Sequence, residues 1–347
     1  MDGGKKIGLG VIGLGRLGHI HAHNIARRME GAYLAAVCDL DPEKLSSVAA
    51  DFGSKAYDSI AALLADDMVE AVVVATPTAV HVEPVEAVLK AGKALFCEKP
   101  LASTLEDNVM LAEKIKNKGL LCQIGFNRRF DPDYLHARRI IEGGKIGSPV
   151  YFHGVSRDPF PPPAWACNPE TGGGLFIDML LHDYDIARFL MNADIVEVFA
   201  REAHLVVDSG GTPRFADNVT VDFQFASGAL GSCHGSMHAE YGYDIRSEVY
   251  GSRGDLQIGG LQKDSLTYCS KAVGISQPST FLWEGEEPHF FARFRESYER
   301  ELQGFVDALR TGSPAKATVD DALQAFRVAV AALESAETGR PVTVAPI

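Results

Sequence analysis

The feature that most constrains this chain is the glycine pattern Gly13-Leu14-Gly15-Arg16-Leu17-Gly18, which directly follows the apolar run Ile7 to Ile12 and opens a helical stretch. In that context the glycines permit a tight turn, close approach of the backbone to a pyrophosphate, and close packing of helix on strand. The free amides at the helix N-terminus would face the anion. The segment therefore predicts a dinucleotide site, although the pattern by itself also suits a ligand-free turn.

An acidic residue strengthens this interpretation. Asp39 ends the second apolar run, Tyr33 to Cys38, twenty-one positions after Gly18. A carboxylate there can accept a hydrogen bond from the ribose 2′-hydroxyl and would repel a 2′-phosphate. The next four residues, Leu-Asp-Pro-Glu, contain no Arg or Lys that could receive such a phosphate. The sequence thus predicts NAD rather than NADP, whereas an isolated acid after a strand would more often be a surface turn residue.

The first third of the chain alternates short apolar runs with helical patterns, which is typical of an α/β domain. A helix is expected from Asp41 to Phe52, because Asp41 can cap the free amides and Pro42 suits the first turn. Right-handed crossovers then give a doubly wound parallel sheet, and we assign residues 1–126 to a Rossmann domain. The expected strands are Ile7 to Ile12, Tyr33 to Cys38, Ala71 to Ala75, Ala94 to Cys97 and Leu121 to Gly125.

Residues 127–347 read as an α+β domain with a large, open, mostly antiparallel sheet. One helix is expected early, from Asp178 to Leu190, and two amphipathic helices close the chain at 290–310 and 319–337. The expected strands are Val150 to Arg157, Ile195 to Leu205, Val219 to Phe225, Leu230 to His238, Asp244 to Tyr250 and Asp255 to Ile258.

Two segments carry residues suited to proton transfer. Asp178 and His182 lie four apart in a helical pattern, on one face, and Asp185 shares that face. A carboxylate beside an imidazole can orient it as a general base, although the same residues could simply cap the helix. Glu98-Lys99-Pro100 follows a parallel strand at its carboxyl end, where open α/β sheets bind ligands. Lys99 could stabilise a forming alkoxide there, or could be an exposed turn lysine.

The chain resembles the Gfo/Idh/MocA oxidoreductases over nearly its whole length. The resemblance rests on the glycine pattern and on four further segments. Within the family, two shorter segments look most like those of inositol 2-dehydrogenases. The family motifs are Ala75 to Thr78 with His81, Glu98 to Pro100, Gly125 to Asp131 and Asp178 to Asp185; the shorter segments are Ser156 to Pro159 and Tyr241 to Arg246.

The resemblance implies an NAD-dependent oxidation of a secondary hydroxyl of a cyclic polyol, myo- or scyllo-inositol, to the ketone. Another sugar, such as an aldose, stays open as the substrate. The resemblance also implies that His182 is the base, that Lys99 assists at the reacting hydroxyl and that Asp178 orients both. It places Thr76, Pro77, His81, Glu98 and Lys99 at the cofactor, and Asn127, Arg128, Asp158, Asp178, His182, Asp185 and Tyr243 at the substrate. It also implies that residues 127–347 serve substrate binding and oligomerisation, with a homotetramer built by packing the open face of the sheet.

Composition excludes several other classes. The net charge of −13 over 347 residues argues against nucleic-acid or anionic-membrane binding. No apolar run is long enough to span a bilayer, no signal peptide is evident, and the six cysteines are widely separated, so we expect a cytoplasmic protein with reduced thiols. We expect no metal, since the alternating His19, His21 and His23 cannot all share a helix face. A catalytically silent dinucleotide sensor remains the alternative from another class.

Overall fold

The computed structural model describes residues 5–159, 173–206, 216–239, 241–260 and 289–346, and four short strands between 262 and 282. The chain divides into two compact units, described separately below. The first comprises Met1–Asn127 and Glu296–Leu323, and the second comprises Arg128–Arg295 and Gln324–Ile347. Residues 296–323, which the sequence analysis placed in the second domain, thus pack with the first unit.

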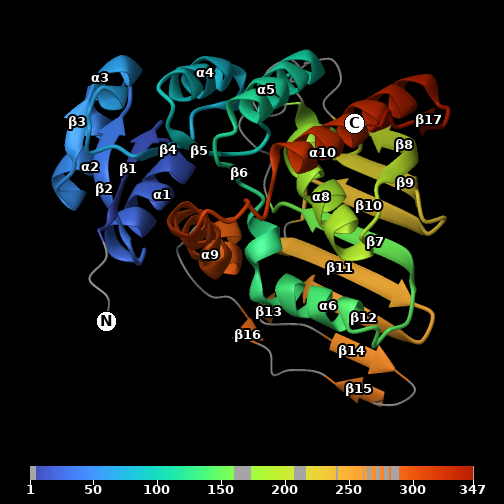
Figure 1. The fold of residues 1–347 in the computed structure, drawn as a ribbon. Coiled ribbons are helices and arrows are strands. Elements are labelled where there is room, and N and C mark those ends of the chain that lie inside the picture. The colour runs from blue at the N-terminus through green and yellow to red at the C-terminus, as the bar shows by residue number, and fades with distance from the viewer. Residues whose placement is uncertain are drawn as a thin grey trace. The chain divides into compact units, whose positions relative to one another are not determined.

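The first unit holds a six-stranded, wholly parallel sheet with the order β3-β2-β1-β4-β5-β6 (Figure 1). The predicted doubly wound sheet is confirmed, and its five predicted strands are present to within a residue at each end. The short β3 was not predicted. The strands are β1 Ile7–Ile12, β2 Ala32–Cys38, β3 Lys55–Tyr57, β4 Ala71–Val74, β5 Ala94–Cys97 and β6 Cys122–Ile124.

Helices alternate with these strands, and local capping explains where they begin. Asp41 accepts hydrogen bonds from the amides of Glu43 and Lys44 and so begins α2, with Pro42 in the first turn, as predicted. Gly53 ends the helix in the left-handed region at φ 66°. The helices are α1 Arg16–Arg27, α2 Pro42–Phe52, α3 Ile60–Leu64, α4 Val82–Lys90 and α5 Leu105–Lys118, with the 3₁₀ turn η1 Thr78–Val80.

The core of the first unit includes residues from the far end of the chain. The long helix α9, His289–Thr311, is kinked at Phe294 and supplies Leu302, Phe305 and Val306 to the cluster around β1 and β5. The rings of Phe96 and Phe305 meet edge to face at 5.9 Å. Burial of this apolar surface is the main stabilising term for such a sheet, so the first unit needs both parts of the chain.

The second unit is built on a nine-stranded sheet with the order β15-β14-β12-β11-β7-β10-β9-β8-β17 (Figure 1). All pairings are antiparallel except that of β7 with β10, so the predicted mostly antiparallel sheet is confirmed. The separate pair β13 and β16 lies outside this sheet. The strands are β7 Pro149–Arg157, β8 Ile195–Ala203, β9 Asn218–Phe225, β10 Leu230–Ser236, β11 Asp244–Gly251, β12 Gly254–Gly260, β13 Gln262–Lys263, β14 Thr267–Ser270, β15 Gly274–Ser276, β16 Phe281–Leu282 and β17 Val342–Thr343.

Helices α6, Pro132–Glu142, and α8, Leu181–Met191, lie over the same face of this sheet (Figure 1). The predicted helix from Asp178 to Leu190 needs correction, because a π-helical turn, η3 Leu175–Met179, precedes α8 and the α-helix begins only at Leu181. The helix α6, which follows the 3₁₀ turn η2 Asn127–Phe130, was not predicted. Helix α10, Val319–Thr338, confirms the last predicted helix.

None of the described helices is long and apolar enough to cross a membrane. Cys38, Cys97, Cys122 and Cys233 are free and buried, as expected for reduced thiols that pack as small hydrophobic residues. Burial raises the pKa of Cys122 to about 12, which keeps that thiol protonated. Cys167 and the side chain of Cys269 lie outside the described residues.

Candidate functional site: the glycine loop and the buried polar groups

The glycine loop joins β1 to α1, and two of its glycines are required by space. Gly13 has φ +88°, and a Cβ there would lie 2.7 Å from the amide nitrogen of Thr76. A Cβ on Gly18 would lie 1.8 Å from the carbonyl oxygen of Gly13. Around Gly15, by contrast, nothing lies within 4 Å of the Cβ position. The loop is therefore packed on its inner side and open at Gly15, where a pyrophosphate could approach the backbone.

Asp39 follows β2 and is tied to this loop. Its Oδ2 accepts a hydrogen bond from the amide of Leu14 at 2.5 Å, and its Oδ1 accepts one from the amide of Asp41 at 2.8 Å. The carboxylate is thus fixed beside the glycine loop, as a ribose-binding acid must be. The next residue, Leu40, is 93% exposed and brings no positive charge.

The segment after β4 is held by a buried histidine. His81 is 1% exposed, with Nδ1 2.9 Å from the carbonyl oxygen of Pro100 and Nε2 2.8 Å from that of Thr76. Burial lowers the pKa of His81, and a neutral ring can donate to only one of these two carbonyls. His81 therefore joins the turn at Thr76 and Pro77 to the segment after β5. Its polar atoms face the backbone, and a direct part at the cofactor stays a prediction.

Glu98 and Lys99 follow β5 and differ in exposure. Glu98 is 4% exposed, and its Oε1 lies 2.6 Å from Nε2 of His21 in α1. Its Oε2 accepts a hydrogen bond from the amide of Lys99 at 3.3 Å. Lys99 itself is half-buried. Of the three alternating histidines, His21 is buried, whereas His19 and His23 both lie near the ring of Phe52.

The structure also brings Glu301 of α9 to this place, which sequence reasoning did not find. One ligand-type atom from each of His21, Glu98 and Glu301 lies within 4.8 Å of the others. Glu301 occupies the buried face of α9, between Tyr298 and Leu302 in sequence. A charged residue on an otherwise apolar helix face was the available signal, but its partners lie some two hundred or more residues earlier.

In the second unit, Asp178 lies in the π-helical turn η3 and His182 in the first turn of α8. Both are half-buried. The break between η3 and α8 means that the simple spacing of four residues in one α-helix does not describe this pair. Gly174 precedes the turn at φ +62°, a conformation that favours glycine. The catalytic roles of Asp178 and His182 stay predictions.

A buried triangle of polar side chains lies beneath α8. Nη1 of Arg128 donates to Oδ1 of Asp183 at 3.0 Å, and Nη2 donates to Oγ of Ser156 at 3.0 Å. Oγ of Ser156 donates to Oδ2 of Asp183 at 2.6 Å. All three residues are at most 3% exposed. Burial raises the pKa of Asp183, and the neighbouring Arg128 opposes that shift.

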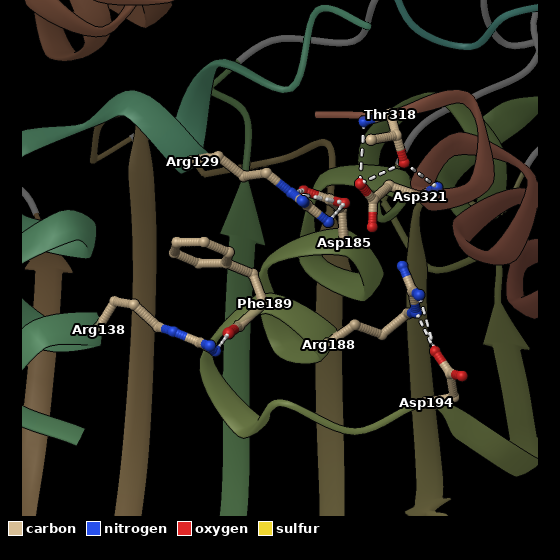
Figure 2. A network of polar contacts seen from close by, with 8 residues as sticks. All are labelled: Arg129, Arg138, Asp185, Arg188, Phe189, Asp194, Thr318 and Asp321. Carbon is tan, nitrogen blue, oxygen red and sulfur yellow. Dashed lines mark hydrogen bonds and ion pairs between the residues drawn. The ribbon is translucent and has the colours of Figure 1, made fainter. Parts of the chain in front are cut away.

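A second ion pair lies beside it. Nε and Nη2 of Arg129 donate to the carboxylate of Asp185, at distances of 2.7 to 3.1 Å, and Figure 2 shows the guanidinium facing both oxygens. The guanidinium groups of Arg129 and Arg138 lie 5.3 and 5.2 Å from the ring centroid of Phe189. Asp185 is 1% exposed. Arg128 and Asp185, which were predicted to contact the substrate, thus each form a buried ion pair. Their contact with the substrate stays a prediction.

The remaining predicted substrate residues are spread over three elements. Asn127 is 3% exposed at the start of η2, and Asp158 follows β7, where its amide donates to the carbonyl of Ser236. Tyr243 precedes β11, and its ring lies edge to face with that of Phe294 at 6.4 Å. Sequence reasoning missed Ser156 and Asp183 as polar core residues, because a lone serine in a strand and one more acid in a helix carry no distinguishing pattern.

A parallel sheet, a glycine loop that opens a helix and an acid fixed beside that loop define a dinucleotide-binding protein. The comparisons with known proteins give the family. The chain belongs to the Gfo/Idh/MocA oxidoreductases: residues 7–126 match the family model described as "NAD-binding Rossmann fold", and residues 138–344 match the model described as "C-terminal alpha/beta domain". The predicted resemblance is confirmed over most of the chain.

Similar proteins cover this chain nearly completely. The scyllo-inositol 2-dehydrogenase (NAD(+)) of Bacillus subtilis is 38% identical over 96% of this chain and 94% of its own length. The myo-inositol 2-dehydrogenase of Thermotoga maritima is 36% identical over 96% and 97%. A crystal structure of scyllo-inositol dehydrogenase from Lactobacillus casei, with bound NAD(H) and scyllo-inositol, superposes with a TM-score of 0.85 at 28% identity, covering 99% of this chain and all of that one.

NAD fits the residues present in the first unit. The open side of Gly15 leaves room for a pyrophosphate, and the fixed carboxylate of Asp39 suits a ribose hydroxyl. Both features belong to one compact unit, and the family model that spans it is that of an NAD-binding fold. NAD is therefore the cofactor of this protein.

Proposed function

We propose that this protein oxidises a secondary hydroxyl of a cyclic polyol, myo- or scyllo-inositol, to the ketone with NAD. The observation that carries the proposal is the full-length similarity to inositol 2-dehydrogenases, together with Lys99, Asp178 and His182 at the matching motifs. The bound NAD(H) and scyllo-inositol in the Lactobacillus casei relative support the same substrate class.

Each of the three residues has a distinct task in this proposal. NAD, when bound, accepts the hydride. His182 takes the proton of the reacting hydroxyl, so its ring must be neutral for oxidation to begin. Lys99 donates a hydrogen bond to the same oxygen and stabilises the negative charge that develops on it. Asp178 accepts a hydrogen bond from the His182 ring and orients it. Substrate positioning falls to the predicted set Asn127, Arg128, Asp158, Asp185 and Tyr243.

A quaternary structure and a cellular location are also part of the proposal. The family resemblance suggests a homotetramer in the cytoplasm. Leu230 of β10 and Tyr250 of β11, each 53% exposed, are both register partners of Tyr151 on β7, so they share one face of the sheet. Exposed apolar residues on neighbouring strands suit a subunit interface on this sheet.

The test of the proposed function is a panel of inositols and aldoses with NAD, following the reduced cofactor by its absorbance. We expect turnover with myo- or scyllo-inositol and little with aldoses. A preference for an aldose would show that the substrate is that sugar and not an inositol. Turnover with no compound of the panel, despite NAD binding, would favour a dinucleotide sensor.

Lys99→Met tests the assignment of the reacting groups. The variant keeps the length of the side chain and removes its charge, so it should fold and bind NAD. Loss of one preorganised donor costs about 3 kcal/mol, and we expect the rate to fall about a hundredfold or more. The measurement is single-turnover reduction of NAD at saturating polyol. Equal rates for the two proteins would remove Lys99 from the reaction.

Asp39 tests the choice of cofactor. In the double variant Asp39→Ser with Leu40→Arg, the carboxylate that repels a 2′-phosphate is gone and an exposed guanidinium takes the place of Leu40. We expect the ratio of kcat/KM for NAD to that for NADP to fall by about tenfold or more. Leu40→Arg by itself is the control. Equal use of both cofactors by the native protein would contradict the role given to Asp39.

A further inference from the structure

His21, Glu98 and Glu301 form a buried polar cluster in the first unit. Its groups come from α1, from the end of β5 and from α9, and their exposed fractions are 0%, 4% and 0%. No described residue forms a hydrogen bond with either carboxyl oxygen of Glu301, although both atoms are buried. Gln123 donates only to the backbone carbonyl of Glu301, at 2.7 Å. The carboxyl group is therefore buried without the hydrogen bonds that an anion would require.

An ionised Glu301 would be costly at this position. A buried carboxylate loses its hydration, and within 4.8 Å lies Glu98, a second carboxyl group. Burial raises the pKa of Glu301 well above its usual value, and the charge of Glu98 raises it further. Glu98, by contrast, has His21 and the amide of Lys99 as donors. One negative charge on the two acids suits this site, and it lies on Glu98.

The distances also bear on a metal ion, since one His and two Glu could in principle bind one. Two ligand atoms on a tetrahedral zinc ion lie about 3.3 Å apart, given bonds of about 2.0 to 2.1 Å. The 2.6 Å between Nε2 of His21 and Oε1 of Glu98 is instead the separation of a short, charge-assisted hydrogen bond. The geometry favours protons over a metal in this cluster.

We propose that Glu301 is a positioning residue for Lys99. Glu301 is held in the core as a neutral acid, and its carboxyl hydroxyl is a donor beside Glu98. This donor fixes Glu98 and, through it, the backbone of Lys99. A protonated carboxyl group has a hydroxyl donor that a carboxylate lacks. A ligand-type atom of Glu98 lies within 4.8 Å of one of Glu301, and Oε2 of Glu98 accepts the hydrogen bond from the Lys99 amide. The catalytic part of this inference rests on the proposed function, whereas the protonation of Glu301 does not.

The first experiment measures protonation through unfolding. In the unfolded chain Glu301 ionises near pH 4.3, so a folded state that keeps the proton loses stability as the pH rises. Between about pH 5.5 and 7.5 the unfolding constant of the native protein, divided by that of Glu301→Gln, should rise about tenfold per pH unit. His21, Glu98 and Tyr298, which lie beside this carboxyl group, are the same in both proteins, so their contributions to the ratio largely cancel. Glu296→Gln, on the exposed side of α9, is the control, and its ratio should stay flat.

The second experiment measures the position of Lys99. Its amide lies between Glu98 and Pro100, and proline has no amide hydrogen, so hydrogen exchange can report on it without overlap from the next residue. Glu301→Leu removes the donor, and we expect exchange of this amide to become about tenfold faster, because a hydrogen bond to a charged group weakens. Glu301→Gln keeps a donor and should remain near the native rate. In turnover, Glu301→Leu should lower kcat with little change in the Kd for NAD, and Glu301→Gln should retain most of kcat.

Each of these measurements can contradict the role proposed for Glu301. A flat unfolding ratio for Glu301→Gln would mean that Glu301 is ionised in the folded protein, and equal exchange rates in Glu301→Leu and native protein would remove its link to Lys99. One equivalent of a divalent metal that copurifies with the native protein and is lost in Glu301→Gln would also overturn the proposal. A protein that oxidises no polyol, yet shows the pH-dependent ratio and the faster exchange, would contradict the proposed function and leave the protonation and positioning of this cluster supported.

Discussion

In the second unit Asp183 and Asp185 are buried to 0% and 1% exposure and each accepts hydrogen bonds from an arginine, whereas in the first unit Glu301 is as deeply buried and no described residue donates to its carboxyl oxygens. The two units thus keep acids in their cores by different means. A paired aspartate keeps its charge, and an unpaired glutamate keeps its proton. The same substitution of an acid by its amide should therefore have opposite consequences in the two places.

The largest effect is expected from Asp185→Ala. This change leaves the guanidinium of Arg129 buried, at 7% exposure, without its carboxylate. Removing one partner of a buried ion pair costs about 3 to 5 kcal/mol, and we expect the free energy of unfolding to fall by that amount. Urea unfolding followed by circular dichroism measures it. A loss below about 1 kcal/mol would place this pair in the class of solvent-screened surface bridges.

A smaller loss of unfolding free energy is expected from Asp183→Asn. The amide keeps the shape and an acceptor for Arg128, but it removes the charge that compensates the guanidinium. We expect a loss of about 2 to 3 kcal/mol, because the hydrogen bonds of a charged group are weakened and not all removed. The matched comparison is Glu301→Gln at pH 7, which should cost little or stabilise. Equal losses of unfolding free energy in the two variants would show that the two units do not differ in how they hold buried acids.

The smallest effect is expected at the surface. Oδ1 of Asp194 accepts hydrogen bonds from Nε and Nη2 of Arg188, at 2.9 and 2.7 Å, at the end of α8 (Figure 2). The side chain of Asp194 is 51% exposed, so water screens the pair. Asp194→Ala should lower the free energy of unfolding by less than about 1 kcal/mol, and less at high salt. A loss as large as that for Asp185→Ala would show that exposure does not separate these pairs.

Much of the first unit could be predicted because its signals are local. The strands β1 and β5 begin and end at the predicted residues, since apolar runs bounded by turn residues mark buried parallel strands. The start of α2 was found from Asp41 and Pro42. The same pair of residues, Asp131 and Pro132, begins α6, where Asp131 caps the amides of Asp133 and Tyr134. That helix could have been predicted from the same signal.

Other features have no local signal. The π-helical turn at Leu175–Met179 adds a residue to one turn without changing the apolar pattern, so the sequence reads as one continuous helix. The cluster at His21 depends on Glu301, 280 residues further along the chain, which no motif connects to it. The ion pairs of Arg128 and Arg129 depend on α8 being laid over β7. Such contacts are products of tertiary packing and can be found only once the fold is known.

The composition of the first unit has a consequence for the order of events during synthesis. The ribosome completes all six strands of its sheet by Ile124, yet Leu302, Phe305 and Val306 of its core and Ala317, which accepts a hydrogen bond from the amide of Ile124, emerge much later. A nascent chain halted near residue 127 therefore carries a sheet that still lacks the part of its apolar cover that α9 supplies. Domains that are synthesised first generally fold first. The core of this first unit is completed only after nearly two hundred further residues have been synthesised. Until then part of its hydrophobic surface stays exposed, and chaperones can bind it.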